Sequence, residues 1–357
     1  MSVYNGERFL NEAVDSILDQ SFEDFEFIII NDGSTDSTGP LLDFYRKRDQ
    51  RVQVYHQENR GLVASLNRGC EAARGKYIAR MDADDIAVKD RILWQLKFME
   101  RHPEVGVVGG AIEFIDITGK SLRTSINLTE DRDLRMALPD CPFWHPTVFM
   151  RKEIITLLGG YREIVTDAED HDLWLRVAEH YQLANLEEVV LKYRLHPYQV
   201  TVRKFRQMAI SSLAAQGAAA SRKNGNPDPL DAVTKITPKV LAELGVTEAD
   251  LEAAVTRKCL WSIQTMCETG DYATAFAMLL ELFKSSGWRH AERRVVSDLY
   301  LFAAQLYWRQ GRFMRSIKEA CHAAIIRPEV LGRPLKQFLR WLRCECRRMR
   351  YGNLLNA

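Results

Sequence analysis

Three aspartates, Asp82, Asp84 and Asp85, directly follow a short apolar stretch, 76–81, that has the composition of a strand. Asp82 and Asp84 are two residues apart, so they share one face while the backbone stays extended. Carboxylates this close repel one another unless a positive charge lies among them, and hard divalent cations bind carboxylate and phosphate oxygens. The spacing therefore predicts a site for a metal ion that carries a diphosphate. A solvated acidic turn after an edge strand is the alternative.

Polar residues also follow two earlier predicted strands, at Tyr4-Asn5 and at Asp32-Gly33-Ser34. In parallel sheets, ligands bind at the carboxyl ends of the strands, so these clusters are expected to meet at one edge. There Asp32 would accept a hydrogen bond from a base such as uracil, and the Tyr4 ring would stack on that base. Asp82 would bind a ribose hydroxyl and Asp84 the metal. An ordinary turn at Asp32 and a half-buried ring at Tyr4 are the alternatives.

Strands and helices alternate along the first hundred residues, which predicts an α/β fold with a largely parallel, helix-covered sheet. The expected strands cover 25–30, 52–55, 76–81 and 105–110, and the expected helices cover 9–18, 37–48, 62–73 and 88–101. A hairpin with a turn at Gly119 is expected over 111–120. The helix from about 170 begins with several acids, which the helix dipole favours at a first turn.

Composition places the chain among ordinary globular proteins of about two domains, with 357 residues, 46% hydrophobic and 27% charged. The formal net charge of +1 gives no reason to expect nucleic acid as a partner. Seven cysteines without a Cys-x-x-Cys pair indicate neither a disulfide framework nor a zinc site, and they favour a reducing compartment. No signal peptide and no apolar run near 20 residues is seen, so a cytoplasmic location is expected.

Five ordered motifs resemble those of family 2 glycosyltransferases, over residues 1 to about 203. They are Val3-Tyr4-Asn5-Gly6, Asn31-Asp32-Gly33-Ser34-Thr35-Asp36, Glu58-Asn59-Arg60-Gly61, Asn67 and Met81-Asp82-Ala83-Asp84-Asp85. The family has the GT-A fold, uses nucleotide-sugar donors and inverts the anomeric centre. The family normally has several more apolar residues before its Tyr-Asn-Gly, so either Met1 is a mis-assigned start or the first strand is truncated.

The resemblance implies roles for individual residues on the donor side. Nucleotide-sugar binding is expected of Tyr4, Asn5, Glu7, Asp32, Ser34, Arg60, Asn67, Asp82 and Ala83. Asp82 and Asp84, with His196 as a third ligand, are expected to hold Mn²⁺ or Mg²⁺. Arg194 either contacts the diphosphate or lies at the surface. The donor is expected to be a UDP-sugar, with a dTDP-sugar fitting nearly as well.

On the acceptor side, Asp167-Ala168-Glu169-Asp170-His171-Asp172 is similar to the family's Glu-Asp motif. Asp170 is then the general base. Glu169 orients the acceptor or lies next to the base without contacting the acceptor. Asp172 lies on another face of the helix and is a weaker candidate for the base. Trp144 and His145 would line the acceptor site. The alternative is that Trp144 packs in the interior and that the hydrogen-bonding groups of His145 are taken up within the protein. The expected acceptor is a hydroxyl of a glycan or of a lipid-linked molecule in the synthesis of bacterial surface polysaccharide.

The C-terminal part is expected to be all helical. We predict a catalytic domain over 1–203, a helical linker over 204–230 and a helical domain over 231–357. Gly270 and Gly311 each begin a similar segment 41 residues apart, which suits tetratricopeptide-like hairpins or a plain bundle. The basic segment 333–350 carries interleaved apolar residues and would either lie on the inner face of the cytoplasmic membrane or pack on a neighbouring helix.

Two other classes compete with a glycosyltransferase. A nucleotidyltransferase would need a Gly-rich, Arg-containing phosphate loop after the first strand, and Tyr4-Asn5-Gly6-Glu7 is not such a loop. A non-catalytic nucleotide-sugar-binding scaffold with helical repeats is the second alternative. The presence of Asp82, Asp84 and Asp170 argues against it.

Overall fold

The computed structural model describes the chain except for residues 126, 198, 200–203 and 332–357. It divides into two compact units, Met1–Thr247 and Glu248–Ala357, each considered by itself below. The basic segment 333–350, for which membrane contact was predicted, lies outside the described residues. Among the helices of the described part, none is both long and apolar enough to cross a membrane.

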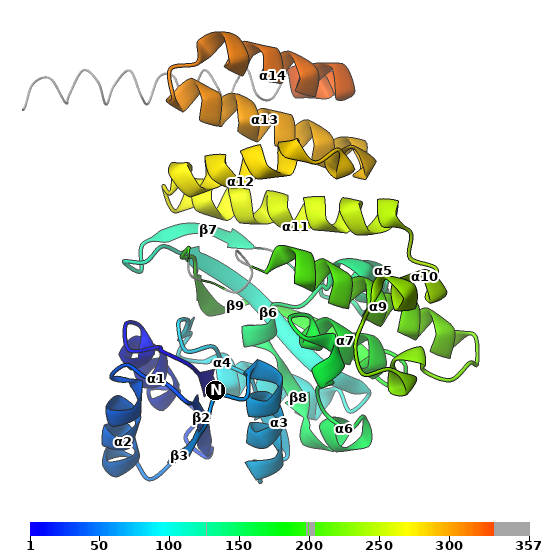
Figure 1. Ribbon diagram of the computed structural model, residues 1–357. Helices are drawn as coiled ribbons and strands as arrows, with labels where there is room; N and C mark the ends of the chain where they lie inside the picture. Colours follow the sequence, from blue (N-terminus) through cyan, green and yellow to red (C-terminus); the bar gives the residue numbers. More distant parts are fainter. Residues whose placement is uncertain (126, 198, 200–203, 332–357) are drawn as a thin grey trace, which may run out of the picture. The chain divides into compact units, whose positions relative to one another are not determined.

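A three-stranded parallel sheet forms the start of the first unit, in the order β1 (Ser2–Val3), β2 (Phe27–Asp32) and β3 (Val52–Gln57). It is connected by α1 (Leu10–Leu18), α2 (Thr38–Arg48) and α3 (Leu62–Ala72). Right-handed crossovers place α1 and α2 on one side of the sheet and α3 on the other, as Figure 1 shows. Every residue of β2 is buried, as expected for a central parallel strand that is covered on both faces.

A second, mixed sheet follows, in the order β4-β8-β6-β9-β5 with β7 paired to β6. Its strands are β4 (Tyr77–Ala79), β5 (Ile86–Ala87), β6 (Val105–Ile115), β7 (Ser121–Ser125), β8 (Phe149–Arg151) and β9 (Gln182–Arg194). Only β6 and β9 run parallel, and the other neighbours pair antiparallel. The parallel arrangement expected from the sequence therefore holds for β1–β3 and not for the second sheet. The expected hairpin is present as β6 and β7, with Gly119 at φ 83° in its turn.

The core of the first unit packs helices against this second sheet. Trp174 is fully buried and lies 5.5 Å from the Phe143 ring, centroid to centroid. The helices of this region are α4 (Arg91–Arg101), α5 (Asp131–Ala137), α6 (Lys152–Leu157), α7 (Glu169–Val177), α9 (Phe205–Lys223) and α10 (Pro238–Glu243), with short 3₁₀ turns η1 (Leu138–Asp140), η2 (His145–Thr147), η3 (Glu163–Val165) and η4 (Pro229–Ala232).

The segment predicted as a linker, 204–230, is an integral part of the first unit. Its helix α9 is joined to α7 by a 2.6 Å hydrogen bond between Ser212 Oγ and His171 Nδ1. Asp228, at the end of the segment, accepts from Arg162 Nη1 at 2.7 Å, and Arg162 also forms an ion pair with the buried Asp172. These contacts hold the segment against α7 and Arg162, and the compact unit Met1–Thr247 includes it, whereas the functional domain bounds stay a prediction.

The second unit is all helical in its described part. It contains α11 (Glu248–Glu268), α12 (Tyr272–Lys284), η5 (Gly287–His290), α13 (Arg293–Arg309), α14 (Phe313–Ile326) and η6 (Pro328–Leu331), and α11 to α14 stack in sequence order in Figure 1. Gly270 and Gly311, at φ 83° and 72°, make the tight turns between α11 and α12 and between α13 and α14. The similar segments found in the sequence are thus two helical hairpins, and their assignment to tetratricopeptide repeats stays a prediction.

The close packing of β6 yields a stability prediction. A Cβ atom on Gly110 would lie 2.7 Å from Val190 Cγ2, so Gly110→Ala overfills the core. We expect it to lower the free energy of unfolding by about 1–3 kcal/mol, measured by urea denaturation. Gly69→Ala in α3 is the matched control, because its Cβ would lie 3.8 Å from Ile30 Cγ1 and helical alanine gains about 0.5–1 kcal/mol over glycine. Equal stabilities of wild type and Gly110→Ala would contradict the packing argument.

Candidate active site

The loops that follow β1 and β2 are joined by reciprocal hydrogen bonds. The Asn5 amide donates to Ser34 Oγ at 2.9 Å, and Asn5 Oδ1 accepts from the Thr35 amide at 2.8 Å. Glu7 Oε2 accepts from the Ser37 amide at 2.9 Å. Asn5, Glu7 and Ser34, which were predicted to bind the nucleotide-sugar, therefore hold the two strand ends together in this structure. Asn5 has φ 52°, a left-handed conformation that asparagine tolerates better than most residues.

Asp32 connects the second strand end to the third. Its Oδ1 accepts from Gln57 Nε2 at 2.7 Å and from the Arg60 amide at 2.8 Å, and its Oδ2 accepts from the Gly61 amide at 2.9 Å. The side chain is buried, whereas Tyr4 is 54% exposed and Arg60 is exposed. A carboxylate has about four acceptor positions, so one remains on Asp32 for a ligand. The loops that follow β1, β2 and β3 are thus joined by hydrogen bonds.

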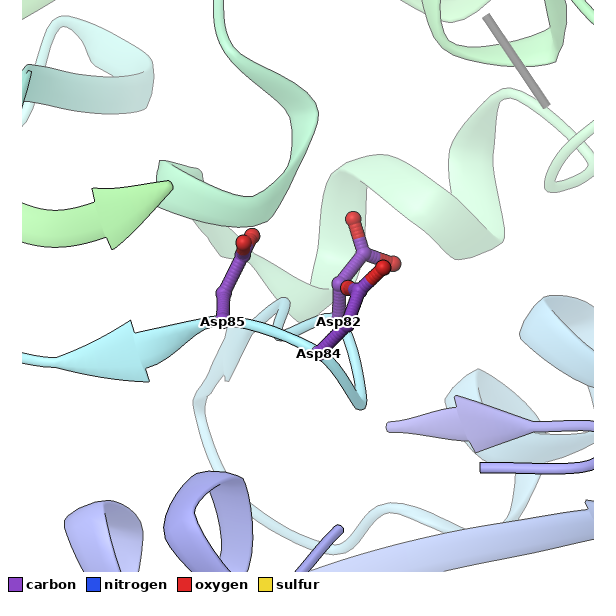
Figure 2. Close-up of side chains that lie close together, drawn as sticks. All are labelled: Asp82, Asp84 and Asp85. Carbon is purple, nitrogen blue, oxygen red and sulfur yellow. The ribbon is translucent and has the colours of Figure 1, made fainter. Parts of the chain in front are cut away.

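The three aspartates after β4 form an acidic cluster. One carboxylate oxygen from each of Asp82, Asp84 and Asp85 lies within 4.8 Å of the other two. Figure 2 shows the Asp82 and Asp84 carboxylates side by side and Asp85 set apart where the chain enters β5. Asp85 is buried, its Oδ1 accepts from the Arg194 amide at 2.8 Å, and its Oδ2 is among the buried atoms of the described residues that have no hydrogen-bond partner. An unsatisfied buried oxygen beside two further carboxylates is the chemistry of a cation site.

His196 contacts this cluster through Asp84, and its role as a metal ligand stays a prediction. Its Nε2 lies 2.9 Å from Asp84 Oδ2, and its ring lies 5.4 Å from that of Phe9, centroid to centroid. Ala83 lies beside the β1 loop, since a Cβ placed on Gly6 would be 3.8 Å from Ala83 Cβ. The acidic cluster, the β1 loop and the end of β9 therefore form one region of the first unit.

Electrostatics in the cluster follow from crowding and burial. Removal from water, together with the charge of Asp84, raises the pKa of Asp82. Burial and the charges of Asp84 and Asp82 raise the pKa of Asp85 well above its ordinary value. A divalent cation would reverse both effects, because it favours the ionised carboxylates.

Three buried arginines lie around the acids, and sequence reasoning considered a site role only for Arg194. Arg80 forms an ion pair with Asp82 Oδ2 through Nη1. Arg194 was expected either to contact the diphosphate or to lie at the surface. In the structure it is fully buried, and its Nε donates to the Asp84 carbonyl at 2.8 Å. Arg91 donates through Nη2 to the Arg80 carbonyl at 2.6 Å. The sequence could have indicated the role of Arg80, because it lies two residues before Asp82 on an extended chain and so shares its face.

The predicted catalytic pair begins α7. Glu169 is buried, and Asp170 is half-buried with its Oδ1 accepting from the His171 amide at 2.7 Å. Asp170 Oδ2 lies 4.0 Å from Cys141 Sγ. Asp172 is fully buried and forms ion pairs with Arg162 and, at 2.8 Å from Oδ2 to Nη2, with Arg176. It therefore has a structural role. Asp167, two residues before Glu169, and Cys141, which contacts Asp170, both have positive φ, at 65° and 56°. Such strained residues cluster at functional sites.

Asn67 and His145 do not have the geometry expected of ligand-binding residues. Both polar ends of Asn67 are used by the Tyr161 backbone, at 2.8 Å from Nδ2 to the carbonyl and 2.8 Å from the amide to Oδ1. His145 Nε2 lies 3.0 Å from the buried Tyr161 hydroxyl, and burial beside Arg80 holds the pKa of His145 well below its ordinary value. Both residues therefore position the loop around Tyr161.

Trp144 is half-buried and lies among aromatic rings. Its indole donates to Asn127 Oδ1 at 3.2 Å, and its ring lies 5.4 Å from that of Phe114 and 5.7 Å from that of Tyr193. Trp144 thus packs largely against other aromatic side chains, as the alternative interpretation expects. A contact of Trp144 with the acceptor stays a prediction.

Burial of Glu169 next to Asp170 gives a pH prediction. These causes raise the pKa of Glu169 from 4.5 to about 8, so the folded protein favours the protonated acid. This contribution to stability is present below pH 4.5 and is lost as the pH rises through about 8. The free energy of unfolding of wild type should therefore fall relative to that of Glu169→Gln between pH 5 and 8, by at most about 1.4 kcal/mol per pH unit in urea titrations. Parallel curves for the two proteins would contradict the burial argument.

Comparison with known proteins agrees with this site. The model of the glycosyl transferase family 2 matches residues 1–157. The protein EpsE of Bacillus subtilis, named as a glycosyltransferase, is 36% identical over 200 residues, covering 54% of this chain and 71% of EpsE. The O-antigen biosynthesis glycosyltransferase WbnJ of Escherichia coli is 32% identical over 202 residues, covering 55% of this chain and 78% of WbnJ.

Solved structures give a weaker likeness. A mannosyltransferase from Pyrobaculum calidifontis, in complex with GDP-Man and Mn²⁺, aligns over 91% of this chain and 84% of its own length. The TM-score of 0.47 and the sequence identity of 17% are too low to carry an inference about the site. The family match and the two relatives, together with strand ends that bring acidic residues to one edge, identify the chain as a glycosyltransferase of family 2 with a GT-A fold.

Proposed function

We propose that the enzyme is a metal-dependent, inverting glycosyltransferase that moves a sugar from a nucleoside-diphosphate donor to a hydroxyl group. The observation that carries this proposal is the cluster of Asp82, Asp84 and Asp85 with His196 beside it, at the edge where the β1–β3 loops meet. A cation site next to joined strand-end loops suits a donor that has a base, a ribose and a diphosphate.

The donor base is assigned to the β1–β2 edge. Tyr4 offers an exposed ring for stacking, and Asp32 keeps one acceptor position for a base N–H. Uracil is the favoured base, because its single N–H between two carbonyl groups can donate to one carboxylate oxygen. Thymine presents the same N–H and carbonyl groups. A UDP-sugar is therefore the first donor to test and a dTDP-sugar the second.

The cation is assigned to Asp84, Asp82 and His196. Carboxylate oxygens suit Mn²⁺ and Mg²⁺ alike, and Asp85, with its unsatisfied oxygen, lies next to them. When bound, the ion would neutralise charge on the departing nucleoside diphosphate. The chain keeps one carboxylate oxygen from each of Asp82, Asp84 and Asp85 within 4.8 Å of the other two, and His196 Nε2 lies 2.9 Å from Asp84 Oδ2.

Asp170 is assigned as the general base. Its Oδ1 is held by the His171 amide, which fixes the carboxylate plane, and the side chain is half-buried and so accessible to an acceptor. Asp170 would take the proton of the acceptor hydroxyl as the new bond between that oxygen and the sugar C1 forms. The bond between C1 and the phosphate oxygen breaks on the opposite face, and the electron pair leaves with the nucleoside diphosphate, which inverts C1.

Glu169 supports the base from the interior. It is buried directly before Asp170, and its raised pKa makes it a proton-bearing neighbour at neutral pH, which limits the repulsion on Asp170. The acceptor is assigned as a glycan or lipid-linked hydroxyl in surface polysaccharide synthesis, with support from the O-antigen role in the name of WbnJ. Trp144 is the residue assigned to an acceptor sugar face.

Replacement of the base tests this mechanism. We expect Asp170→Asn to lower the rate of UDP release from a UDP-sugar, with Mn²⁺ and a panel of glycan acceptors, by about 10²–10⁴-fold while the Kd for UDP stays unchanged. Asp133→Asn is the matched control, since Asp133 is also an acid in the first turn of a helix and its loss tests a capping role. Full activity of Asp170→Asn would remove Asp170 from the mechanism. Wild-type protein that binds UDP, GDP or dTDP but releases none from the sugar donors would instead favour a binding scaffold.

A further inference from the structure

Arg80 is a buried cation of the first unit that contacts the acidic cluster. Its side chain is 7% exposed, and Nη1 forms an ion pair with Asp82 Oδ2. Its Nε is among the buried atoms of the described residues that have no hydrogen-bond partner. Because an unpaired buried donor costs about 1–3 kcal/mol, a guanidinium kept in this state requires an explanation other than stability.

The backbone of Arg80 is fixed on both sides. Its amide donates to the Val148 carbonyl at 2.9 Å, and its carbonyl accepts from Arg91 Nη2 at 2.6 Å. Arg91 is itself fixed by a 3.1 Å hydrogen bond from Nε to Gln95 Oε1 in α4. The guanidinium of Arg80 thus starts from a rigid point of the sheet, so it can hold a partner carboxylate in one orientation.

We propose that Arg80 is a positioning residue of the active site that orients the Asp82 carboxylate for the donor. The inference rests on the proposed function, which makes Asp82 part of the donor site. Nε and Nη1 of Arg80 are inaccessible to solvent and Nη1 forms the ion pair with Asp82, so the effect of Arg80 is exerted through Asp82.

Arg151 provides the matched comparison. It is also 7% exposed and lies in the same sheet, but its guanidinium donates to the Val105 and Met99 carbonyls at 2.9 Å and to no carboxylate in the described residues. A lysine at either position keeps the charge and loses the planar fork of donors. Arg80→Lys and Arg151→Lys therefore have a similar structural cost, and only the first alters the acids.

The experiment measures the melting temperature, the Kd for UDP with Mn²⁺, and kcat and KM for UDP release from a UDP-sugar. For Arg80→Lys we expect a rise of about tenfold in the donor KM and in the Kd for UDP, because a displaced Asp82 binds less well. For Arg80→Met we expect an additional fall in kcat, to a total loss of about 10²–10³-fold in kcat/KM. Arg151→Lys should change the melting temperature alone.

Double-mutant cycles locate the effect. In an Asp82→Asn background the Arg80→Lys change should leave the donor KM where Asp82→Asn alone puts it, since the orienting contact is already lost. Additive effects, or Arg80→Lys with wild-type kcat and KM, would overturn the proposal, and Arg80→Lys decides the matter if Arg80→Met does not fold. Wild-type protein that neither binds UDP, GDP or dTDP nor releases them from sugar donors would defeat the proposed function itself, which is a different result from an inert Arg80.

Discussion

Mutual repulsion among the carboxylates after β4 is the constraint on which the site depends. Three acids within 4.8 Å stay in a buried loop only if positive charge surrounds them, and the chain supplies it from Arg80, Arg91 and Arg194. Arg80 is paired with Asp82, whereas Arg91 and Arg194 donate to the backbone carbonyls of Arg80 and Asp84, so together they also fix the loop. In the proposed cation site, ligands held in place in this way would reduce the cost of binding.

A second principle of the first unit is that the ends of its strands are held by hydrogen bonds to one another. Asn5 and Ser34 join the first two strand ends, and Asp32 joins the second to the third through the amides of Arg60 and Gly61. Strained backbone is found at Asn5 in the loop after β1, and at Cys141 and Asp167 in the segments that precede η2 and α7. Conformations of this kind persist only where the surroundings over-determine them, so the site is rigid because of its hydrogen bonds.

Sequence reasoning succeeded where the relevant geometry is local. The strand-to-loop transitions at Asp32 and Asp82 and the acidic start of α7 follow from residue spacing alone, and the confirmed alternation of β1–β3 with helices follows from periodicity. It was less successful where a partner is distant in sequence. Asn67 and His145 both turn to Tyr161, and the Asn67 contact spans 94 residues, which no local pattern reports. The second sheet was expected to be parallel because the antiparallel partner of β4, the strand β8, lies about 70 residues further along the chain.

The central claim is that the acidic cluster holds a divalent cation together with a nucleoside diphosphate. Calorimetric titration of UDP into the protein, with and without Mn²⁺ and in wild type and Asp84→Asn, tests it most directly. The account predicts that Mn²⁺ tightens UDP binding by at least about tenfold in wild type and leaves it unchanged in Asp84→Asn, because Asp84 would hold the ion and the ion would offset the charge of the diphosphate. Equal UDP affinity with and without Mn²⁺ in wild type would contradict the account.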